Sequence, residues 1–312
     1  METVKSAVPV RPEGWEEGRE VLLRDPWPEL YRAMEGRLRV DALVVGVEGK
    51  GDDRRLVLDL GGVRGYLPLA EAGDGLPPDP VQAVGTHLAC RVVACDRAGG
   101  TCRLERKSLV EEMARETWEA LLAACREVLQ LRERERALSV DDPLARGEIR
   151  AVRLKVPQVA PLWPCAVRWV SRQRAVVDLG GVLGTMPRVE VAWTPPEHVG
   201  EVLKPGDCLR VKVIDLDTAA REALVSRRWV LPDPWEGADK KYRKGGVYAG
   251  KVSRHVSDGR AVLVELEPGL AVLAQALPAG LPVGSEVLLE VREVDVATRR
   301  GFGRVVRVRS RS

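Results

Sequence analysis

The sequence predicts a mainly β protein made of tandem five-stranded barrels, with one long α-helix between two of them. Three observations lead to this fold class. The stretch DLGGVRGYLPLAE at residues 59–71 returns as DLGGVLGTMPRVE at residues 178–190, a strand-like pattern downstream of it occurs three times, and a helical period interrupts the series once. Segments that return in a fixed order indicate repeated structural units.

The repeated stretch predicts a tight β-hairpin. In each copy an apolar run leads into Asp-Leu-Gly-Gly, and a third glycine precedes another short apolar segment. Gly61 and Gly180 stand where the chain must reverse, and glycine adopts the positive φ of such turns without a Cβ clash. Pro68 and Pro187 end the return strand, because proline donates no hydrogen bond to a neighbouring strand.

The pattern that occurs three times predicts the fourth strand of each unit. It begins at Gly85, Gly206 or Gly284, places apolar residues two apart and ends at an aspartate. This spacing puts the apolar side chains on one face of a strand. About five strands per copy suit a small closed barrel without an unpaired edge. The other predicted strands include residues 37–47, 101–105, 222–226, 247–256 and 303–309.

These residues together resemble the ribosomal S-one repeat, an RNA-binding oligonucleotide-binding (OB) barrel. The resemblance is carried by the DLGGVRGYLP hairpin, the glycine-to-aspartate strand, and the strand endings LERK and VSRR. The segment LPDPWE at residues 231–236 is similar to the junction in front of interior repeats of that family, and RDPW at residues 24–27 is a second copy. The resemblance covers most of residues 24–310 and implies three tandem OB barrels that bind single-stranded RNA.

The repeats divide the chain into five parts. In the third copy Leu-Glu-Pro-Gly-Leu replaces the Leu-Gly-Gly-Val of the hairpin, so that copy is degenerate. We expect an acidic N-terminal tail and junction at residues 1–29, a first OB barrel at 30–108, a linker helix at 109–148, a second OB barrel at 149–228, and a third, degenerate OB barrel with a basic C-terminus at 229–312.

The linker predicts one amphipathic helix over residues 109–138. Apolar residues such as Met113, Trp118 and Leu121 recur every three or four positions, which is the period of one helix face. Its charged end, RERER, is expected in solvent. Residues 149–156 then alternate like a strand, prolines interrupt, and residues 165–170 resume the alternation. One of these two strands must be an addition to the five-strand plan.

The composition is that of a soluble globular protein, with 45% hydrophobic and 30% charged residues. The start lacks the apolar core of a signal peptide and no apolar run approaches membrane-spanning length, so we expect a cytoplasmic protein with no membrane partner. Six cysteines without CxxC spacing and three scattered histidines predict no metal site and no cofactor. No phosphate loop, HExxH or GxSxG motif occurs, so we expect no enzyme activity.

An OB barrel of this kind stacks unpaired bases on aromatic side chains while lysine and arginine neutralise phosphates. Tyr66 stands where the family hairpin presents such an aromatic, whereas its counterparts Thr185 and Ala271 cannot stack. The resemblance, with one surviving tyrosine, therefore implies either weak RNA binding or binding that depends heavily on charge. The candidate RNA-binding residues are Tyr66, Arg64, Arg91, Arg103, Arg106, Lys107, Arg188, Trp193, Arg210, Lys212, Arg227, Arg228, Arg304, Arg307 and Arg309.

The distribution of charge favours polyanion binding by the C-terminal half. The net charge is only +3, but residues 149–228 hold 13 Lys and Arg against 8 Asp and Glu, and residues 240–312 hold 14 against 7. Along the last strand we expect Arg307 and Arg309 on the outward face, with Val306 and Val308 inward.

The tryptophans are expected to serve different purposes. Trp169 shares a strand face with Cys165 and Val167 in strict alternation, so we expect it in the core. Tryptophans of the two DPW junctions are expected to plug the junctions between barrels. Trp193 lies in a proline-containing loop and is expected to be exposed, as a contact for a base or a protein.

Two functions from different classes remain open. The first is a non-catalytic single-stranded RNA-binding protein linked to translation or RNA processing, with the ribosome or RNA-processing proteins as further partners. The second is a protein–protein interaction scaffold that docks through degenerate OB barrels and the linker helix. A third hypothesis is an accessory subunit of an RNA enzyme.

Overall fold

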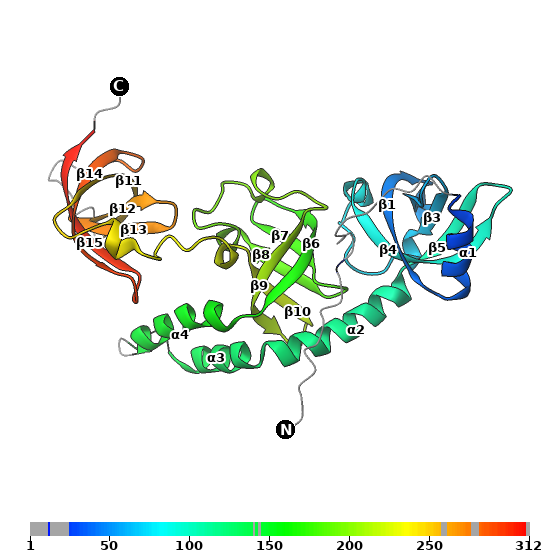
Figure 1. Cartoon of the computed structure of the whole chain (residues 1–312), viewed down its shortest axis with the longest axis horizontal. Coiled ribbons are helices and arrows are strands. Elements are labelled where there is room, and N and C mark those ends of the chain that lie inside the picture. Colours follow the sequence, from blue (N-terminus) through cyan, green and yellow to red (C-terminus); the bar gives the residue numbers. More distant parts are fainter. Residues whose placement is uncertain are drawn as a thin grey trace. The chain divides into compact units, whose positions relative to one another are not determined.

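Three closed five-stranded barrels follow one another along the chain (Figure 1). The structure, a computed structural model, describes residues 12, 25–139, 141–142, 145–256, 261–275 and 281–309. The chain forms two compact units, Met1–Val230 with the first two barrels and Leu231–Ser312 with the third. The prediction of a mainly β fold with tandem five-stranded barrels is confirmed. Most of the predicted N-terminal tail lies outside the described residues.

Each barrel repeats one strand order. In the first, neighbouring strands run β1-β2-β3-β5-β4 with β4 paired to β1, and β3 and β5 are parallel. The other two barrels have the same connections. The strands are β1 (Arg39–Glu48), β2 (Arg55–Asp59), β3 (Arg64–Pro68), β4 (His87–Asp96), β5 (Thr101–Glu105), β6 (Leu162–Val170), β7 (Arg174–Asp178), β8 (Leu183–Pro187), β9 (Cys208–Asp217), β10 (Glu222–Ser226), β11 (Val247–Val256), β12 (Ala261–Glu267), β13 (Leu270–Gln275), β14 (Glu286–Asp295) and β15 (Arg300–Val308).

The repeated stretch folds as the predicted hairpin in the first two barrels. The Asp59 carboxylate accepts a hydrogen bond from the Gly62 amide at 2.7 Å, and Asp178 accepts one from the Gly181 amide at 2.6 Å. Both glycines have positive φ, +94° and +90°, a conformation that side chains with a Cβ rarely adopt. The aspartate and the second glycine of the motif therefore define the turn.

A β-bulge interrupts the first strand of every barrel. The register of β1, β6 and β11 shifts by one residue against the next strand, and the residue in the bulge is Val45, Arg168 or Ser253. Val45 and Ser253 are exposed, whereas Arg168 is buried. The bulge thus holds a different side chain in each barrel while the ladder around it stays the same.

Because of the bulge in β6, the side chains that follow it point to the opposite face of the strand. Cys165 and Val167 are buried, but Trp169 is half-exposed. The prediction that Trp169 lies in the core is therefore wrong. It assumes an uninterrupted alternation, and one inserted residue moves every later side chain to the other face.

Short helical segments cover one end of the first and third barrels. Helix α1 (Trp27–Glu35) packs Trp27 into the first core, and Trp235 packs into the third core ahead of α5 (Ala238–Lys241). The Trp235 indole N–H donates to the Gly269 carbonyl in the β12–β13 turn at 3.1 Å. Both tryptophans of the DPW junctions are thus buried against the barrel that follows them.

The linker contains three helices, α2 (Lys107–Ala124), α3 (Arg126–Ala137) and α4 (Ala145–Val159), where the sequence predicts one. Cys125, with ψ of 12°, separates α2 from α3. Its amide still donates to the Leu121 carbonyl, and its carbonyl still accepts from the Leu129 amide. The single helix predicted over residues 109–138 is therefore bent, and no proline or glycine marks the bend in the sequence.

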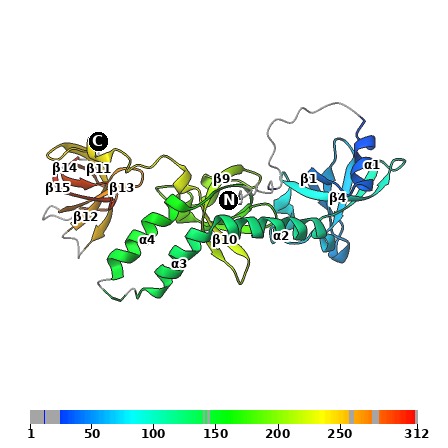
Figure 2. The ribbon, with the colours of Figure 1, turned by 60° about the horizontal axis from the view of Figure 1, so that its bottom comes forward.

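The strand predicted over residues 149–156 is wrong, because these residues lie in α4. Ile149, Val152 and Val156 are buried and stand three or four positions apart, the spacing of one helix face. Helix α4 lies beside α3 (Figure 2). The first strand of the second barrel is β6, so residues 165–170 hold the strand that belongs to the barrel.

Ion pairs join α3 to α4 and to the second barrel. The Glu135 carboxylate accepts from Arg132 at 2.6 Å and from Arg153 of α4 at 2.5 Å. Arg132 also donates from Nε to the Ile214 carbonyl of β9 at 3.0 Å. The RERER segment, expected in solvent, therefore anchors the helical hairpin to the barrel.

Helix α2 connects the first two barrels within one compact unit. Met113 packs against Ala89 of β4. Four residues later the Thr117 hydroxyl donates to the Gly180 carbonyl at 2.6 Å. A Cβ on Gly181 would lie 2.6 Å from a backbone nitrogen of α2. The helix therefore rests directly on the hairpin turn of the second barrel.

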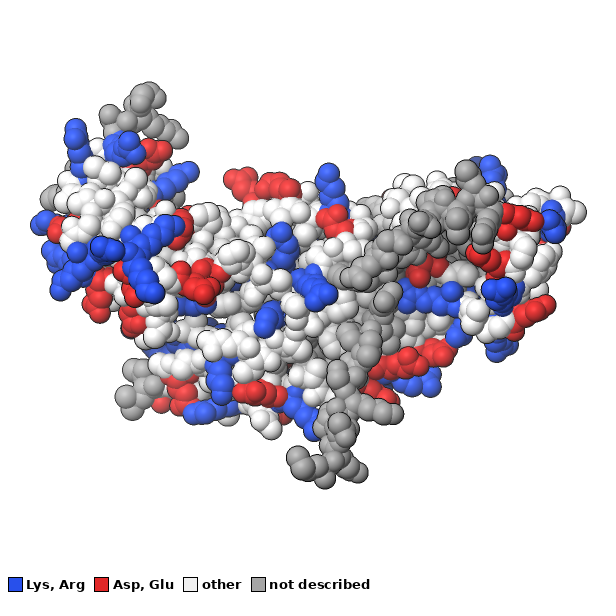
Figure 3. Space-filling model, viewed as in Figure 1, with Lys and Arg blue, Asp and Glu red and all other residues white. Residues whose placement is uncertain are grey.

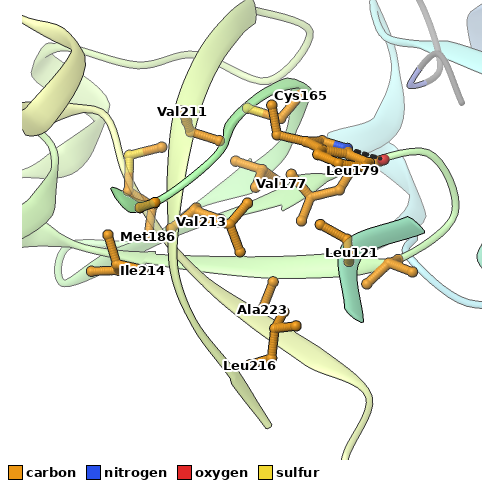
Figure 4. Packing of buried hydrophobic residues seen from close by; sticks show 14 of the residues in the cluster. Leu121, Cys165, Val177, Leu179, Met186, Val211, Val213, Ile214, Leu216 and Ala223 are labelled. Atoms are coloured by element: carbon orange, nitrogen blue, oxygen red, sulfur yellow. Dashed lines mark hydrogen bonds between the residues drawn. The ribbon is translucent and has the colours of Figure 1, made fainter. Parts of the chain in front are cut away.

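The core of the second barrel includes residues from all three linker helices. Trp118 and Leu121 of α2 and Val152 of α4 belong to the same buried cluster as the strand residues. Figure 4 shows Leu121 near Val177 and Leu179 of the barrel.

Every helix within the described part of the chain is too short or too polar to cross a lipid bilayer.

Candidate nucleic-acid interface

The outer face of the first barrel carries an aromatic ring beside a guanidinium group. Strand β3 buries Gly65 and Leu67 and leaves Tyr66 between them half-exposed. Arg55, at the start of β2, places its guanidinium carbon 4.1 Å from the centroid of the Tyr66 ring, within the range of a cation–π contact. Arg55 also donates to Glu48 at 3.2 Å. The ring and the carboxylate together orient the Arg55 side chain.

Two further arginines share this face. Arg64 precedes Tyr66 by two residues on β3, and Arg103 lies opposite Tyr66 in the parallel β3–β5 pair; both are exposed. Arg103 donates to Glu71 at 2.5 Å. The structure therefore brings Tyr66, Arg64 and Arg103 together, and it adds Arg55, which sequence reasoning missed. We call these four residues the first platform.

In the second barrel an arginine of β7 lies beside an aromatic ring of β6, whereas the ring in the first barrel belongs to β3. The Arg174 guanidinium carbon lies 5.5 Å from the centroid of the Trp169 ring. Arg174 begins β7 as Arg55 begins β2, and each pairs with the proline that ends the following strand. Thr185 occupies the position of Tyr66. We call Trp169 and Arg174 the second platform.

The third barrel places apolar side chains at the equivalent position. Leu273 pairs with Phe302 in the parallel β13–β15 ladder, as Tyr66 pairs with Arg103 in the first barrel. The expectation that Ala271 corresponds to Tyr66 is therefore wrong, because Leu273 pairs with both Leu263 and Phe302, as Tyr66 pairs with both Val57 and Arg103. Phe302 is 41% exposed, so the third barrel also presents an aromatic ring.

An acidic cleft of about 500 Å³ adjoins the position of Thr185 in the second barrel. Three carboxylates, from Asp215, Asp217 and Glu222, and the single cation Arg136 line it. Arg136 is itself paired with Asp215 at 2.8 Å. The excess of negative charge disfavours a phosphate backbone in this cleft.

Four of the predicted cations donate to main-chain carbonyls. Arg106 is only 2% exposed and donates to the carbonyls of Ala72 and Asp74 at 2.5 and 2.7 Å. Burial lowers the pKa of the Arg106 guanidinium, with nearby Asp178 among the groups that oppose this shift. The corresponding contacts are Arg188 to Pro196, Lys212 to Ala160 and Arg227 to Val191. The buried Arg106 therefore cannot meet a ligand at the surface.

Three others are held by carboxylates. Arg91 donates to Glu112 of α2 at 2.5 Å, and Arg304 to Glu290 at 2.8 Å. Arg228 donates to Glu190 at 2.8 Å. Each of these contacts occupies part of a guanidinium group, which has five N–H donors.

Trp193 is half-buried, although the sequence predicts that it is exposed. Its ring meets the ring of Trp229 edge to face, with centroids 4.8 Å apart. The guanidinium of Arg228 lies 5.4 Å from the Trp193 centroid and 5.3 Å from that of Trp229. Trp193 therefore belongs to a packed cluster, separate from the first and second platforms in sequence.

The remaining predicted cations are exposed. The expectation that Val306 and Val308 face inward is wrong, because both are 41% exposed, and the register shifts along the β14–β15 pair. Figure 3 shows Lys and Arg side chains gathered over the third barrel. The remaining predicted cations, all exposed, are Lys107 at the start of α2, Arg210 of β9, and Arg307 and Arg309 at the end of the third barrel.

The described residues contain no group of three His, Cys, Asp or Glu side chains placed to hold a metal ion. Burial raises the pKa of Cys90 and of Cys125 to about 12. Both thiols are thus protonated at neutral pH, whereas nucleophilic cysteines are thiolates. The described surface offers cationic and aromatic contacts at the platforms.

Comparisons with known proteins agree with this geometry. Residues 167–228, in the second barrel, match the family described as S1 RNA binding domain. The small ribosomal subunit protein bS1 of Rhodopseudomonas palustris is 23% identical over 300 residues, covering 91% of this chain and 46% of that protein. The bS1 protein of Mycobacterium tuberculosis is 24% identical over 295 residues, covering 91% of this chain and 54% of that protein. The chain thus spans about half the length of these curated relatives.

A partial match joins the chain to an enzyme. The 4-hydroxy-3-methylbut-2-enyl diphosphate reductase of Clostridium tetani is 30% identical over 144 residues, covering 43% of this chain and 22% of the reductase. So small a share of the reductase carries no reaction over to this chain.

Proposed function

We propose that this chain, a tandem of three repeats of the S-one RNA-binding type, is a non-catalytic single-stranded RNA-binding protein. It acts in translation or RNA processing in the cytoplasm, with the ribosome or RNA-processing proteins as further partners. The match of the second barrel to an RNA-binding family and the similarity of 91% of the chain to bS1 proteins support this proposal.

The observation that carries the proposal is the first platform. Its half-exposed Tyr66 ring offers a stacking surface to a base, and the Arg55 guanidinium, 4.1 Å from the ring centroid, adds positive charge at the same point. Arg64 and Arg103 flank the ring on the same face. A base on the ring would leave its phosphates within reach of these cations.

The other two barrels supply related contacts. The second platform offers Trp169 with Arg174, and the third barrel offers Phe302 beside Leu273. Stacking of one base contributes about 1–3 kcal/mol, so no single barrel suffices for tight binding. We propose that affinity accumulates over the barrels and that the exposed arginines contribute the salt-dependent part.

The proposal is tested by titrating a fluorescently labelled single-stranded RNA with the full chain over a series of salt concentrations. We expect the affinity to fall steeply as salt rises, because bound cations release counterions from the phosphates. Tyr66→Ala should weaken binding further at every salt concentration. Arg115→Ala is the control, because Arg115 is exposed on α2, in the linker outside the barrels.

An absence of binding at low salt would contradict the proposal and favour a protein–protein interaction scaffold. Equal affinity of the Tyr66→Ala and Arg115→Ala variants would contradict the role of the first platform. A labelled duplex of the same length serves as a second ligand, since stacking on Tyr66 requires an unpaired base.

A further inference from the structure

Two cysteines face each other across adjacent strands of the first barrel. Cys95 of β4 and Cys102 of β5 are direct partners in the antiparallel ladder, and their sulfur atoms are 3.4 Å apart. They stand one residue inside the end of this ladder, at Asp96 and Thr101. No disulfide joins them in the structure, where both are free thiols.

The backbone geometry suits a disulfide. Residues directly opposite each other on antiparallel strands have Cα atoms about 4.5–5.5 Å apart, and disulfides span Cα distances of about 4.4–6.8 Å. Since the sulfur atoms must approach to about 2.05 Å, the bond needs side-chain rotation and no new strand position. The equivalent pair in the second barrel is Leu216 with Ala223, so the cysteines are a property of the first barrel.

The two thiols differ in their exposure to solvent. Cys95 is half-exposed, whereas Cys102 is 2% exposed and belongs to the core of the barrel. Burial, together with the hydrogen bond to Cys95, raises the pKa of Cys102 to about 12. An oxidant from solvent therefore meets the Cys95 sulfur first, and the Cys102 sulfur is already in place behind it.

We propose that Cys95 and Cys102 form a reversible disulfide site that reacts with hydroperoxides. The Cys95 sulfur attacks the distal oxygen of the hydroperoxide, and the thiol proton ends on the departing oxygen, giving a sulfenic acid and releasing water or an alcohol. The Cys102 sulfur then attacks the Cys95 sulfur while the proton of the Cys102 thiol passes to the sulfenic oxygen, so that the S–S bond forms and the oxygen leaves as water. With hydrogen peroxide, two thiols and one peroxide give one disulfide and two waters.

The site adjoins the first platform. Cys102 precedes Arg103, which lies opposite Tyr66 in the β3–β5 pair. The disulfide would link β4 to β5 beside that arginine. The proposal concerns the sulfur chemistry alone, so it holds whether or not the chain binds RNA.

The test uses the reduced full chain and hydrogen peroxide in near-equimolar amount, followed by alkylation of remaining thiols and tryptic digestion without reductant. Arg91, Arg97 and Arg103 are cleavage sites, so Cys95 lies in the peptide VVACDR and Cys102 in AGGTCR. We expect these two peptides to appear joined in mass spectra and to separate on reduction. The joined pair should exceed any other disulfide by about tenfold, since reactivity follows access and proximity.

Three variants sharpen the test. Cys102→Ser should leave Cys95 as a sulfenic acid that dimedone traps, because the resolving sulfur is gone. Cys208→Ser removes the exposed cysteine and should leave the joined pair unchanged. Cys95→Ser should leave Cys102 unmodified. Oxidation of Cys208 with both Cys95 and Cys102 still alkylated would overturn the proposal, as would cross-linking of Cys95 between two chains.

Discussion

The guanidinium group of Arg168 donates a hydrogen bond to the main-chain carbonyl of His87, 2.9 Å away. A side chain of the second barrel thus reaches the fourth strand of the first. Arg168 is 4% exposed, and its Nη2 lies 3.8 Å from the carboxylate of Asp178, which is 2% exposed. Burial lowers the pKa of Arg168, and Asp178 opposes that shift. The contact between barrels therefore depends on a buried charge pair.

We expect Arg168→Met to destabilise the unit that holds the first two barrels. The substitution leaves the Asp178 carboxylate buried with one cation fewer, and breaking a buried pair costs about 3–5 kcal/mol. Urea denaturation of the full chain measures the change in free energy of unfolding. Arg172→Met, at an exposed position, is the matched control and should change it by less than about 0.5 kcal/mol. Equal stability of the two variants would show that the contact is not required.

Gly181→Ala should destabilise the chain more than Gly62→Ala. The two glycines hold the same place in their hairpins and share a positive φ, so the backbone strain of the substitution is similar. A Cβ at position 62 meets nothing within 4 Å, whereas at position 181 it would come within 2.6 Å of the α2 backbone. Thermal denaturation of both variants isolates the contribution of α2 packing. Equal losses would contradict the close packing of α2 on the hairpin.

We expect the Glu135 carboxylate to contribute to the free energy of unfolding in a pH-dependent way. Burial acts to raise the pKa of Glu135, but hydrogen bonds from Arg153 and Arg132 outweigh it and hold the pKa below its usual value. A carboxyl whose pKa is lower in the folded state stabilises the fold above the unfolded-state pKa, about 4.3. That contribution is lost as the pH falls through the folded-state pKa.

Glu135→Gln should therefore lower the free energy of unfolding at pH 7, and the difference from the wild type should shrink as the pH falls from about 5 to about 3. Glu133→Gln, at an exposed position of the same helix, is the control and should show no such trend. A difference independent of pH would mean that the Glu135 charge does not stabilise the helical hairpin.

Trp169→Ala should weaken binding of single-stranded RNA. If the Trp169 ring stacks on a base, its loss costs about 1–3 kcal/mol, or roughly 5-fold to 150-fold in affinity. Thr185→Ala, at the position that Tyr66 occupies in the first barrel, should leave the affinity unchanged. Fluorescence anisotropy with the same labelled RNA compares the two variants. A larger effect of Thr185→Ala would place the RNA on the acidic side of this barrel.

The barrels could be predicted from sequence because their determinants are local. The Asp-Leu-Gly-Gly turn needs glycine at a positive φ, and the fourth strand keeps its apolar residues two apart in all three copies. These requirements recur at fixed offsets, so repetition made each weak signal stronger. The resemblance to the S-one repeat singled out Tyr66, and the structure leaves this residue half-exposed on β3.

The errors come from features that local patterns do not encode. A bulge at Arg168 turned Trp169 outward, and strict alternation could not foresee it. Residues 149–156 satisfy both a strand and a helix pattern over a short run, and packing on α3 decides for the helix. Arg106 reads as a surface cation, but the fold around it buries the side chain and supplies carbonyl acceptors.

The bulge in the first strand has a consequence for how such arrays diversify. A bulged residue has no partner in the strand ladder. The residue type at this position is therefore constrained by the surroundings of the barrel there and not by strand pairing. Solvent borders Val45 and Ser253, and a neighbouring barrel borders Arg168. A single amino-acid substitution at the bulge can therefore create or remove a fixed contact between adjacent barrels, while each barrel keeps its fold.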